Sequence, residues 1–528
     1  MTDRLTHRQI LVIYTGLMLA MLLAALDQTI VSTALPTIVG DLGGLNRLSW
    51  VVTAYLLAST ISQPIYGKLG DLYGRKRLFQ FAIVIFLIGS ALCGIAQNMD
   101  ELIGFRALQG LGAGGLMVGA LAIIGDIVPP RERGRYQGYM GGVFAVASVV
   151  GPLIGGFFVD NLSWRWCFYV NLPVGIAALI VIAIVLHHPS ERKSHRIDYE
   201  GAAALALGAG LLTLGLTWGG TQYPWTSWQV IGSFIVGATA VVGFVVIERY
   251  AAEPLIPLKL FRNDVFNVCS VMSLLVGMAM FGSLVYLPLF FQVVHKVSAT
   301  QSGLWLLPLM GGVLAASIMG GRAISKLGRY RTFPIVGTAL IAVGMFLLSR
   351  IGVSSSYLFI ALGMVVLGIG LGLVMPVLVL AVQNAVPPSD MGTATSASTF
   401  FRSIGGVFGV AIFGAIFSNR LAYWLPKSLP ASANLTEKQA EALLHSSPAQ
   451  LEKLPPAIHN GLIDAFSNSL NPVFTWAIPF GIAAFLVSLL LREVPLRDRG
   501  TAPAATAEAG FSPETVETIQ VDELAETS

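Results

Sequence analysis

The stretch Gly67-Lys-Leu-Gly-Asp-Leu-Tyr-Gly-Arg-Lys-Arg77 lies between two apolar runs, each long enough to cross a bilayer. Its glycines allow close backbone approaches that a Cβ atom would block. Asp71 is the only acid among the four cations of this stretch. Cations alone would suffice to orient a membrane protein, so the glycine and aspartate spacing indicates a further role. The candidate residues of this loop are Gly67, Asp71, Gly74, Arg75 and Arg77.

Composition places the whole chain among membrane proteins. Of its 528 residues, 55% are hydrophobic and 11% are charged, against about 25% charged in soluble domains. Continuous apolar runs of about 20 residues indicate helices and not the alternating strands of a membrane barrel. We therefore predict an all-α polytopic membrane protein. The cations form no basic face for nucleic acid, and no phosphate-binding loop, nucleophile elbow or paired catalytic carboxylates indicate an enzyme.

Fourteen membrane spans can be placed on the sequence. Their predicted bounds are 10–38, 48–67, 78–97, 102–126, 135–159, 164–187, 199–219, 228–248, 266–294, 302–321, 333–349, 356–382, 393–418 and 471–491. With the amino terminus inside, cytoplasmic segments contain 22 of the 32 lysines and arginines and external segments contain eight. This excess predicts a multi-pass protein of the cell membrane with both termini in the cytoplasm. We expect it to function as a monomer.

An internal repeat predicts the architecture. The opening stretch recurs as Gly321-Arg-Ala-Ile-Ser-Lys-Leu-Gly-Arg-Tyr-Arg331, 254 residues later. Pro129-Pro130 with Gly134 recurs as Pro387-Pro388 with Gly392, 258 residues later. Two landmarks with nearly one period predict two six-span halves, related by a pseudo-twofold axis along the membrane normal, with a substrate cavity between them. A chance repetition of the loop pattern is the alternative.

The repeat divides the chain into four predicted parts. They are an N-terminal six-helix half (1–188), two inserted helices with connectors (189–262), a C-terminal six-helix half with an external loop at 420–470 (263–491), and a disordered cytoplasmic tail (492–528). The external loop contains helical stretches at 437–444 and 458–466 that could lie against the membrane face. The two inserted spans contain no membrane-buried charge, so we expect them at the periphery.

Two ionisable residues lie within predicted spans of the first half. Asp27 is in span 1, where a carboxylate costs about 3 kcal/mol at mid-membrane. Such residues mark ion or proton pathways, although a permanently paired structural aspartate is the alternative. Arg106 in span 4 is the expected partner, with an electrostatic role because a guanidinium keeps its proton; snorkelling to the external surface is the alternative. Gln109 lies near the same helix face and could bond to this pair.

Span 5 contains Ala147-Ser-Val-Val-Gly-Pro-Leu-Ile-Gly-Gly156. Gly151, Gly155 and Gly156 thin one face of the helix, and we expect a kink near Pro152. Such a helix can pack closely and rock against a partner, although ordinary glycine packing is the alternative.

Other groups are less informative. Asp126 at the inner end of span 4 either pairs with a neighbouring helix or is solvated. Arg402 in span 13 is either a cavity cation or a snorkelling side chain. We expect no metal site and no cofactor, because the cysteines lack metal-ligand spacing and the loop histidines are expected to be solvated. These are Cys93, Cys167 and Cys269, and His187, His188 and His195.

Four of these stretches resemble signatures of the major facilitator superfamily, in the correct order. The opening loop resembles the superfamily's signature loop, and Arg106 to Gly115 resembles its fourth-span proton-coupling motif. The stretch 147–156 resembles the antiporter signature of the exporting branch, with Ala147 where glycine is expected. Span 1 is similar to that of the 14-span drug:proton antiporters. Its matching positions are Asp27, Thr29, Ala34, Leu35 and Pro36.

The resemblance implies a proton-driven antiporter of hydrophobic or amphipathic compounds, of the multidrug efflux and antibiotic resistance type. The chain departs from the pattern because Ser325 replaces the acid in the second loop and spans 9–14 contain no plain mid-membrane carboxylate. The second departure favours monovalent or neutral substrates. Export of a self-made metabolite or lipid on the same fold is one alternative, and a non-transporting membrane sensor is another.

Overall fold

The computed structural model describes residues 7–42, 48–128, 130–185, 198–220, 223–297, 299–429 and 456–496. These residues belong to one compact unit that ends at Leu496, and within them the structure is helical, with a single isolated bridge between Gly219 and Tyr223. The elements are α1 (His7–Leu42), α2 (Leu48–Tyr73), α3 (Arg75–Ile95), α4 (Met99–Ile127), α5 (Pro130–Asn161), α6 (Trp166–Tyr169), α7 (Asn171–Val185), α8 (Tyr199–Trp218), α9 (Trp228–Tyr250), η2 (Leu258–Arg262), α10 (Asp264–Val293), α11 (Ala299–Trp305), α12 (Leu307–Leu327), α13 (Thr332–Leu348), α14 (Tyr357–Ala385), η3 (Pro388–Asp390), α15 (Met391–Ser428) and α18 (Pro456–Leu489).

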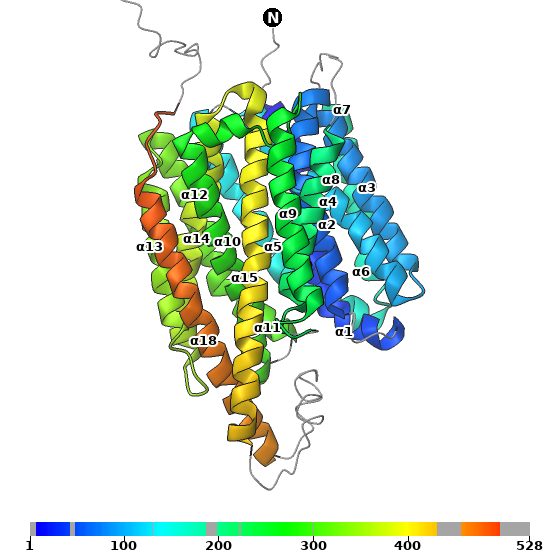
Figure 1. Ribbon diagram of the computed structural model, residues 1–528, viewed down its shortest axis with the longest axis vertical. Helices are drawn as coiled ribbons and strands as arrows, with labels where there is room; N and C mark the ends of the chain where they lie inside the picture. Colours follow the sequence, from blue (N-terminus) through cyan, green and yellow to red (C-terminus); the bar gives the residue numbers. More distant parts are fainter. Residues whose placement is uncertain are drawn as a thin grey trace, which may run out of the picture. The chain divides into compact units, whose positions relative to one another are not determined.

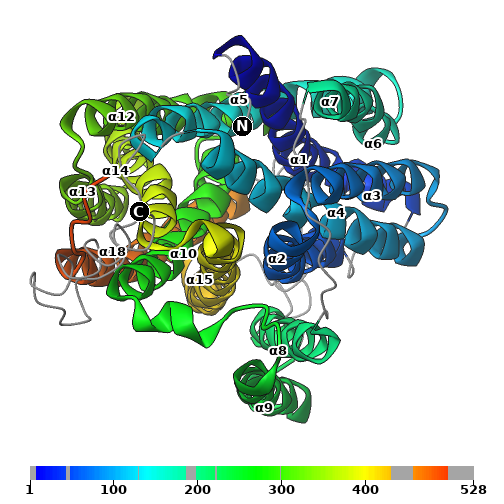
Figure 2. The same ribbon diagram turned by 90° about the horizontal axis from the view of Figure 1, so that it is seen from above.

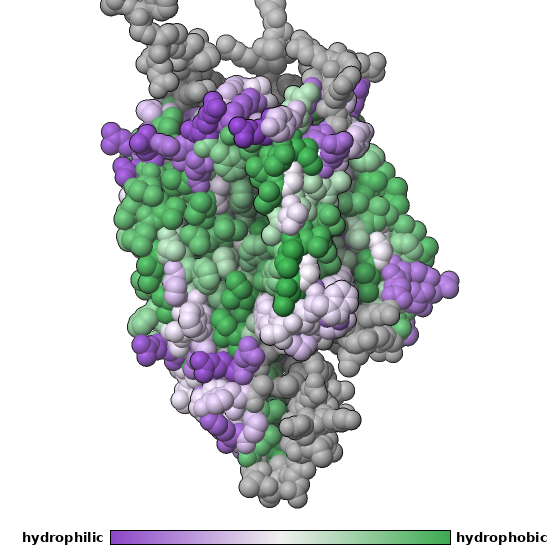
Figure 3. All heavy atoms as spheres, in the orientation of Figure 1, coloured by the Kyte–Doolittle hydropathy of each residue, from purple (hydrophilic) through white to green (hydrophobic). Residues whose placement is uncertain are grey.

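The fold is that of a helical membrane protein, as predicted. In the described part of the chain, 11 helical segments are long and apolar enough to cross a membrane. Two shorter apolar helices, Asp264–Met280 and Thr332–Leu348, and the more polar α2 occupy three further predicted spans. That the protein has fourteen membrane spans remains a prediction. Figure 3 shows the apolar side chains as a broad belt between more polar ends.

Two differences between the helices and the predicted spans concern the charged stretches of the chain. The charged stretch at 67–77 is not an open loop, because α2 continues to Tyr73 and α3 begins at Arg75. The break is confined to Gly74, whose φ of 92° suits only glycine. At the other end of the chain, α15 continues to Ser428 and α18 already begins at Pro456, so the predicted stretch 458–466 is part of a long helix. The predicted stretch 437–444 lies outside the described residues.

Viewed along the helices, two groups are evident (Figure 2). In the first, α4 packs against α2 and α3, and α1 packs against α5 and α7. In the second, α14 packs against α12 and α13, and α10 packs against α15 and α18. The groups meet where α2 packs against α15 and where α5 packs against α12. Polar side chains on these helices can therefore act at the contact between the groups.

Helices α8 and α9 lie outside these two groups (Figure 2). They pack against each other, and α8 also contacts α2 and α15. A cysteine at Leu207, which is 52% exposed on α8, is expected to react with lipid-phase maleimides at the same rate with and without substrate. A cysteine at the buried Leu205 serves as the control for reagent access. Protection of Leu207→Cys by substrate would place this helix in the transport pathway.

Candidate functional site

A buried polar cluster lies inside the first group of helices. The carboxylate of Asp27 on α1 is fully buried, and its Oδ2 lies 2.5 Å from a guanidinium nitrogen of Arg106 on α4. Its Oδ1 accepts a hydrogen bond from Gln109 Nε2 at 2.8 Å. The same guanidinium nitrogen of Arg106 also donates to Gln109 Oε1 at 2.7 Å. The structure thus brings together the three residues that were predicted to interact.

Aromatic and apolar groups close the cluster around the arginine. The Arg106 guanidinium carbon lies 4.1 Å from the ring centroid of Tyr55 and 5.9 Å from that of Phe168. Tyr55 is itself fully buried, on α2. Such ring faces stabilise a cation electrostatically, and an ion pair in this apolar setting is expected to be much less screened than one in water. The arginine does not snorkel, since only 1% of it is exposed.

Asn171 on α7 completes the cluster, although it was not predicted as a site residue. Its Nδ2 donates to Asp27 Oδ1 and to Ser90 Oγ, both at 2.9 Å. Asp27 therefore accepts hydrogen bonds from three side chains on two other helices, an arrangement that suits an ionised carboxylate. The sequence could have indicated this residue, because an asparagine in an otherwise apolar span is expected to form hydrogen bonds between membrane helices.

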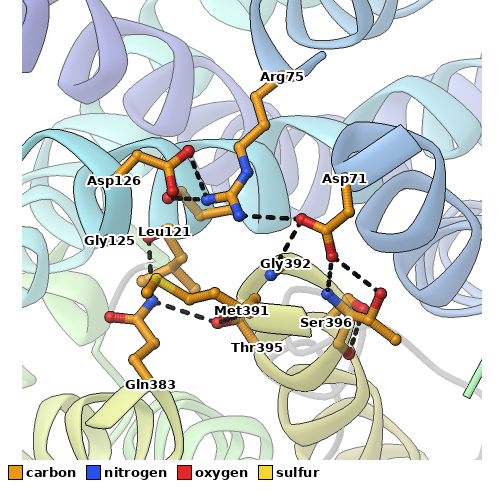
Figure 4. Close-up of polar contacts among 12 residues, drawn as sticks. Asp71, Arg75, Leu121, Gly125, Asp126, Gln383, Met391, Gly392, Thr395 and Ser396 are labelled. Atoms are coloured by element: carbon orange, nitrogen blue, oxygen red, sulfur yellow. Dashed lines mark hydrogen bonds and ion pairs between the residues drawn. The ribbon is translucent and has the colours of Figure 1, made fainter. Parts of the chain in front are cut away.

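Asp71 links the two groups of helices at one end of the molecule (Figure 4). Its carboxylate accepts hydrogen bonds from Gly392 N at 3.2 Å, Thr393 N at 2.7 Å and Thr393 Oγ1 at 2.9 Å. These amides belong to the first turn of α15, where backbone N–H groups have no partner within the helix and the helix dipole favours an anion. Asp71 thus occupies the N-terminus of a helix from the other group.

Two glycines allow this contact. A Cβ atom on Gly392 would lie 2.8 Å from Asp71 Cγ, and a Cβ atom on Gly67 would collide with the Ser396 side chain. Both positions need the absence of a side chain for α2 to approach α15. The predicted importance of Gly67 therefore has a steric basis in this structure.

Arg75 holds Asp71 from within its own group (Figure 4). One guanidinium nitrogen lies 2.9 Å from Asp71 Oδ1 and the other lies 2.8 Å from Asp126 Oδ2 on α4. Arg75 also donates to the Ala122 carbonyl oxygen. Of the two alternatives for Asp126, the structure shows the pair with a neighbouring helix, and Arg77 is exposed on α3.

Two amide side chains add contacts between the groups. Gln383 on α14, buried to 2% exposure, donates to the Leu121 carbonyl oxygen on α4 at 3.2 Å. Gln63 on α2 donates to Ser403 Oγ on α15 at 3.2 Å. Neither residue was predicted. A polar side chain in an apolar helix is the feature of the sequence that could have indicated each of them. Their partners could not be inferred, because they are 262 and 340 residues away in the sequence.

Gln383→Leu is expected to weaken the contact between the two groups at the Asp71 end. It removes the hydrogen bond to Leu121 of the first group, in addition to one to Thr395 within the second group. Loss of the bond between the groups costs about 1 kcal/mol, which would shift a two-state equilibrium about fivefold. Double electron–electron resonance between spin labels at the exposed Tyr73 and Leu327 measures the distance between the two groups. The fraction of molecules with a long distance should increase in Gln383→Leu. Gln292→Leu is the matched control, because Gln292 bonds to Ser302 within one group. An unchanged distance distribution in Gln383→Leu would argue against this role.

The second copy of the loop makes different contacts. Here the backbone amides of Tyr330 and Arg331 donate to the carboxylate of Glu493 at 2.7 and 3.2 Å. Glu493 follows α18, so this acid belongs to the same group of helices as the loop. Toward the first group, Arg322 donates to Tyr139 Oη at 3.5 Å. Ser325, at the position of the missing acid, bonds to the Gly321 carbonyl oxygen of its own helix.

Helix α5 packs closely against α1 at the predicted glycines. A Cβ atom on Gly151 would collide with Thr29, and one on Gly155 would lie 2.9 Å from the Ile30 carbonyl oxygen. The helix is continuous through Pro152, which lies beside Gly303 of α11 in the second group. Gly156 is partly buried. This helix therefore contacts both groups.

Arg402 lies on α15, one residue before the Ser403 that contacts α2, and is partly buried. Among the described residues, no group of three or more histidine, cysteine, aspartate or glutamate side chains could hold a metal ion. The three predicted loop histidines lie outside those residues.

Comparison with known proteins places this arrangement in a family. The model described as Major Facilitator Superfamily matches residues 17–410. The chain belongs to the major facilitator superfamily. An uncharacterized MFS-type transporter of Mycobacterium tuberculosis, Rv1877, is 44% identical over 487 residues, which is 92% of this chain and 70% of the relative. Multidrug transporter protein MdtP of Bacillus subtilis is 39% identical over 506 residues, 92% of this chain and 93% of the relative.

A solved structure agrees with this assignment. The proton:xylose symporter XylE, bound to 6-bromo-6-deoxy-D-glucose, superimposes with a TM-score of 0.61 over 92% of this chain and 96% of that chain. At 14% identity this similarity concerns the fold alone. This superfamily member is therefore a multi-span membrane transport protein with relatives named as multidrug transporters, and its family is one of transporters rather than enzymes.

Proposed function

We propose that the protein is a proton-coupled antiporter that exports hydrophobic or amphipathic compounds across the cell membrane. The observation that carries the proposal is the fully buried Asp27, paired with Arg106 inside the first group of helices. Ionisable residues in this position mark proton pathways, and the chain contains no motif for ATP. The relative MdtP is named as a multidrug transporter, which supports several amphipathic substrates over one.

Coupling would follow from competition at Asp27. A proton from the exterior neutralises the carboxylate and weakens its ion pair with Arg106, whose guanidinium stays charged. Return of the proton to the cytoplasm restores the pair. If substrate binding favours the ionised carboxylate, proton and substrate bind in alternate states of the carrier, which is antiport.

The Asp71 contacts would form the cytoplasmic gate. With both termini in the cytoplasm, the contact of Asp71 with α15 closes the inner side, and its release opens the cavity to the cytoplasm. The two six-helix halves, residues 1–188 and 263–491, would then rock against each other, with Gly151 and Gly155 of α5 allowing the movement against α1. Helices α8 and α9 would take no part in the pathway.

Proteoliposomes with an acidic lumen and the cytoplasmic face outward test this proposal. Ethidium should accumulate in the lumen, and its addition should raise the luminal pH as protons leave in exchange. Nigericin, which collapses the pH gradient, should abolish the accumulation. Accumulation that persists after nigericin would contradict proton coupling. Flux of a single compound class would indicate a metabolite or lipid exporter, and binding without flux would indicate a sensor.

A further inference from the structure

Arg402 is a charged residue within a membrane helix that neither the gate nor the Asp27 cluster uses. It lies 11 residues into α15, which is about 17 Å from the start of the helix. It is therefore near the middle of the membrane and not at a surface. Part of its surface is still exposed.

This guanidinium has no counter-charge. Among the residues that the structure describes, its side chain has no hydrogen bond or ion pair. Between residues 264 and 428 the sequence contains two acids, Asp264 and Asp390. Asp264 pairs with Arg492 and Asp390 pairs with Lys259, each at 2.8 Å.

The interior acids of the first group are also occupied. Asp27 pairs with Arg106, and Asp71 pairs with Arg75. An uncompensated cation inside a membrane protein is costly and faces a cavity or a partner. Among the described residues, Arg402 is therefore a cation of the membrane interior that has no acidic partner, and a ligand can neutralise it.

Polar side chains lie near Arg402 along α15, a helix that packs against α2 of the other group. One helical turn earlier, Ser398 Oγ lies 3.2 Å from Ser273 Oγ of α10, and Thr399 is buried. The next residue, Ser403, bonds to Gln63 of the other group. Hydroxyl and amide groups of this kind are suitable donors for an oxyanion.

We propose that Arg402 is the binding site for an anionic group on the substrate, such as the carboxylate, sulfonate or phenolate of an amphipathic organic monoanion. This inference rests on the proposed export function and names its substrate class. A guanidinium offers paired N–H donors that match a planar oxyanion, which an ammonium does not. The apolar body of the same molecule would lie against the surrounding membrane helices.

The test uses two probes with one skeleton, the anion 1-anilinonaphthalene-8-sulfonate and the neutral N-phenyl-1-naphthylamine. Export of both is measured in the proteoliposomes described above, and the ratio of the two rates is compared between variants. Because both rates are measured on the same preparation, their ratio does not change when a variant loses folded protein or overall turnover. Arg402→Gln is expected to lower the anion-to-neutral ratio at least about tenfold, while Arg402→Lys, which keeps the charge, lowers it less.

Arg420→Gln is the matched control, because Arg420 is an exposed arginine of the same helix; its ratio should equal that of wild type. A second measurement needs no variant: 1-anilinonaphthalene-8-sulfonate bound to purified wild type should be displaced by naphthoate and not by its methyl ester. Equal ratios in wild type and Arg402→Gln, or displacement by both compounds, would overturn the inference. Failure of the export function itself would appear separately, as a wild type that exports neither probe against its gradient.

Discussion

Asp27→Asn is expected to abolish export against a gradient while leaving the protein inserted in the membrane. Asparagine resembles the protonated acid in shape and charge, so the carrier can no longer alternate between the two protonation states. The hydrogen bonds from Gln109 and Asn171 can still reach the remaining carbonyl oxygen. We therefore expect some binding and downhill exchange of a neutral substrate to remain.

The measurement is ethidium accumulation in proteoliposomes with an imposed pH gradient. Asp41→Asn is the matched control, since it is the same substitution on the same helix at a position 55% exposed; it should accumulate ethidium as wild type does. In the same assay Arg106→Lys should impair coupling less than Arg106→Ala, because lysine keeps the positive charge. Some impairment is expected, because lysine lacks the planar guanidinium. Uphill accumulation by Asp27→Asn would place the proton site elsewhere, and Asp126 would be the next residue to test.

Asp71→Asn is expected to slow turnover at least about tenfold, since a charge-assisted hydrogen bond is worth about 1.5 to 3 kcal/mol. The carboxylate binds two backbone amides at the start of α15 and the guanidinium of Arg75. Asparagine removes the charge that both the helix N-terminus and the arginine favour. The closed inner gate is then less stable, and the carrier spends more time open to the cytoplasm.

Turnover of Asp71→Asn would be measured as the initial rate of ethidium transport at equal amounts of reconstituted protein. Asp264→Asn provides the control, because the exposed pair of Asp264 with Arg492 lies within the second group and such pairs contribute little. Wild-type turnover in Asp71→Asn would refute the gating role of this residue.

Much of the fold could be predicted from the sequence because membrane helices are long and apolar. The length of α2 could not, since Lys68, Gly70 and Asp71 have the composition of a loop. Glycine is tolerated in membrane helices that pack closely, so α2 continues to Tyr73 and only Gly74, with its positive φ, interrupts it. Helix α18 also begins before the apolar run that predicted it, because the helical stretch predicted at 458–466 continues into that run without a break.

Residues of the candidate site could be predicted where a charged side chain is costly to bury in a membrane. Asp27 and Arg106 stood out for this reason, and the structure places them together. Asn171 and Gln383 did not stand out, because a neutral amide costs less to bury than a charge and its role depends on which helices become neighbours. The contact of Asp71 with Gly392 and Thr393 joins segments more than 300 residues apart, which spacing along the chain cannot reveal.

Proton release on substrate binding tests the central claim most directly. Purified wild type in weakly buffered detergent solution, at a series of starting pH values, is mixed with ethidium while a pH indicator records the protons released. Because substrate and proton compete at Asp27 in the proposed cycle, wild type should release protons in proportion to the bound ethidium. Asp27→Asn should bind some substrate but release none. Equal proton release by wild type and Asp27→Asn would contradict the assignment of Asp27 as the proton carrier.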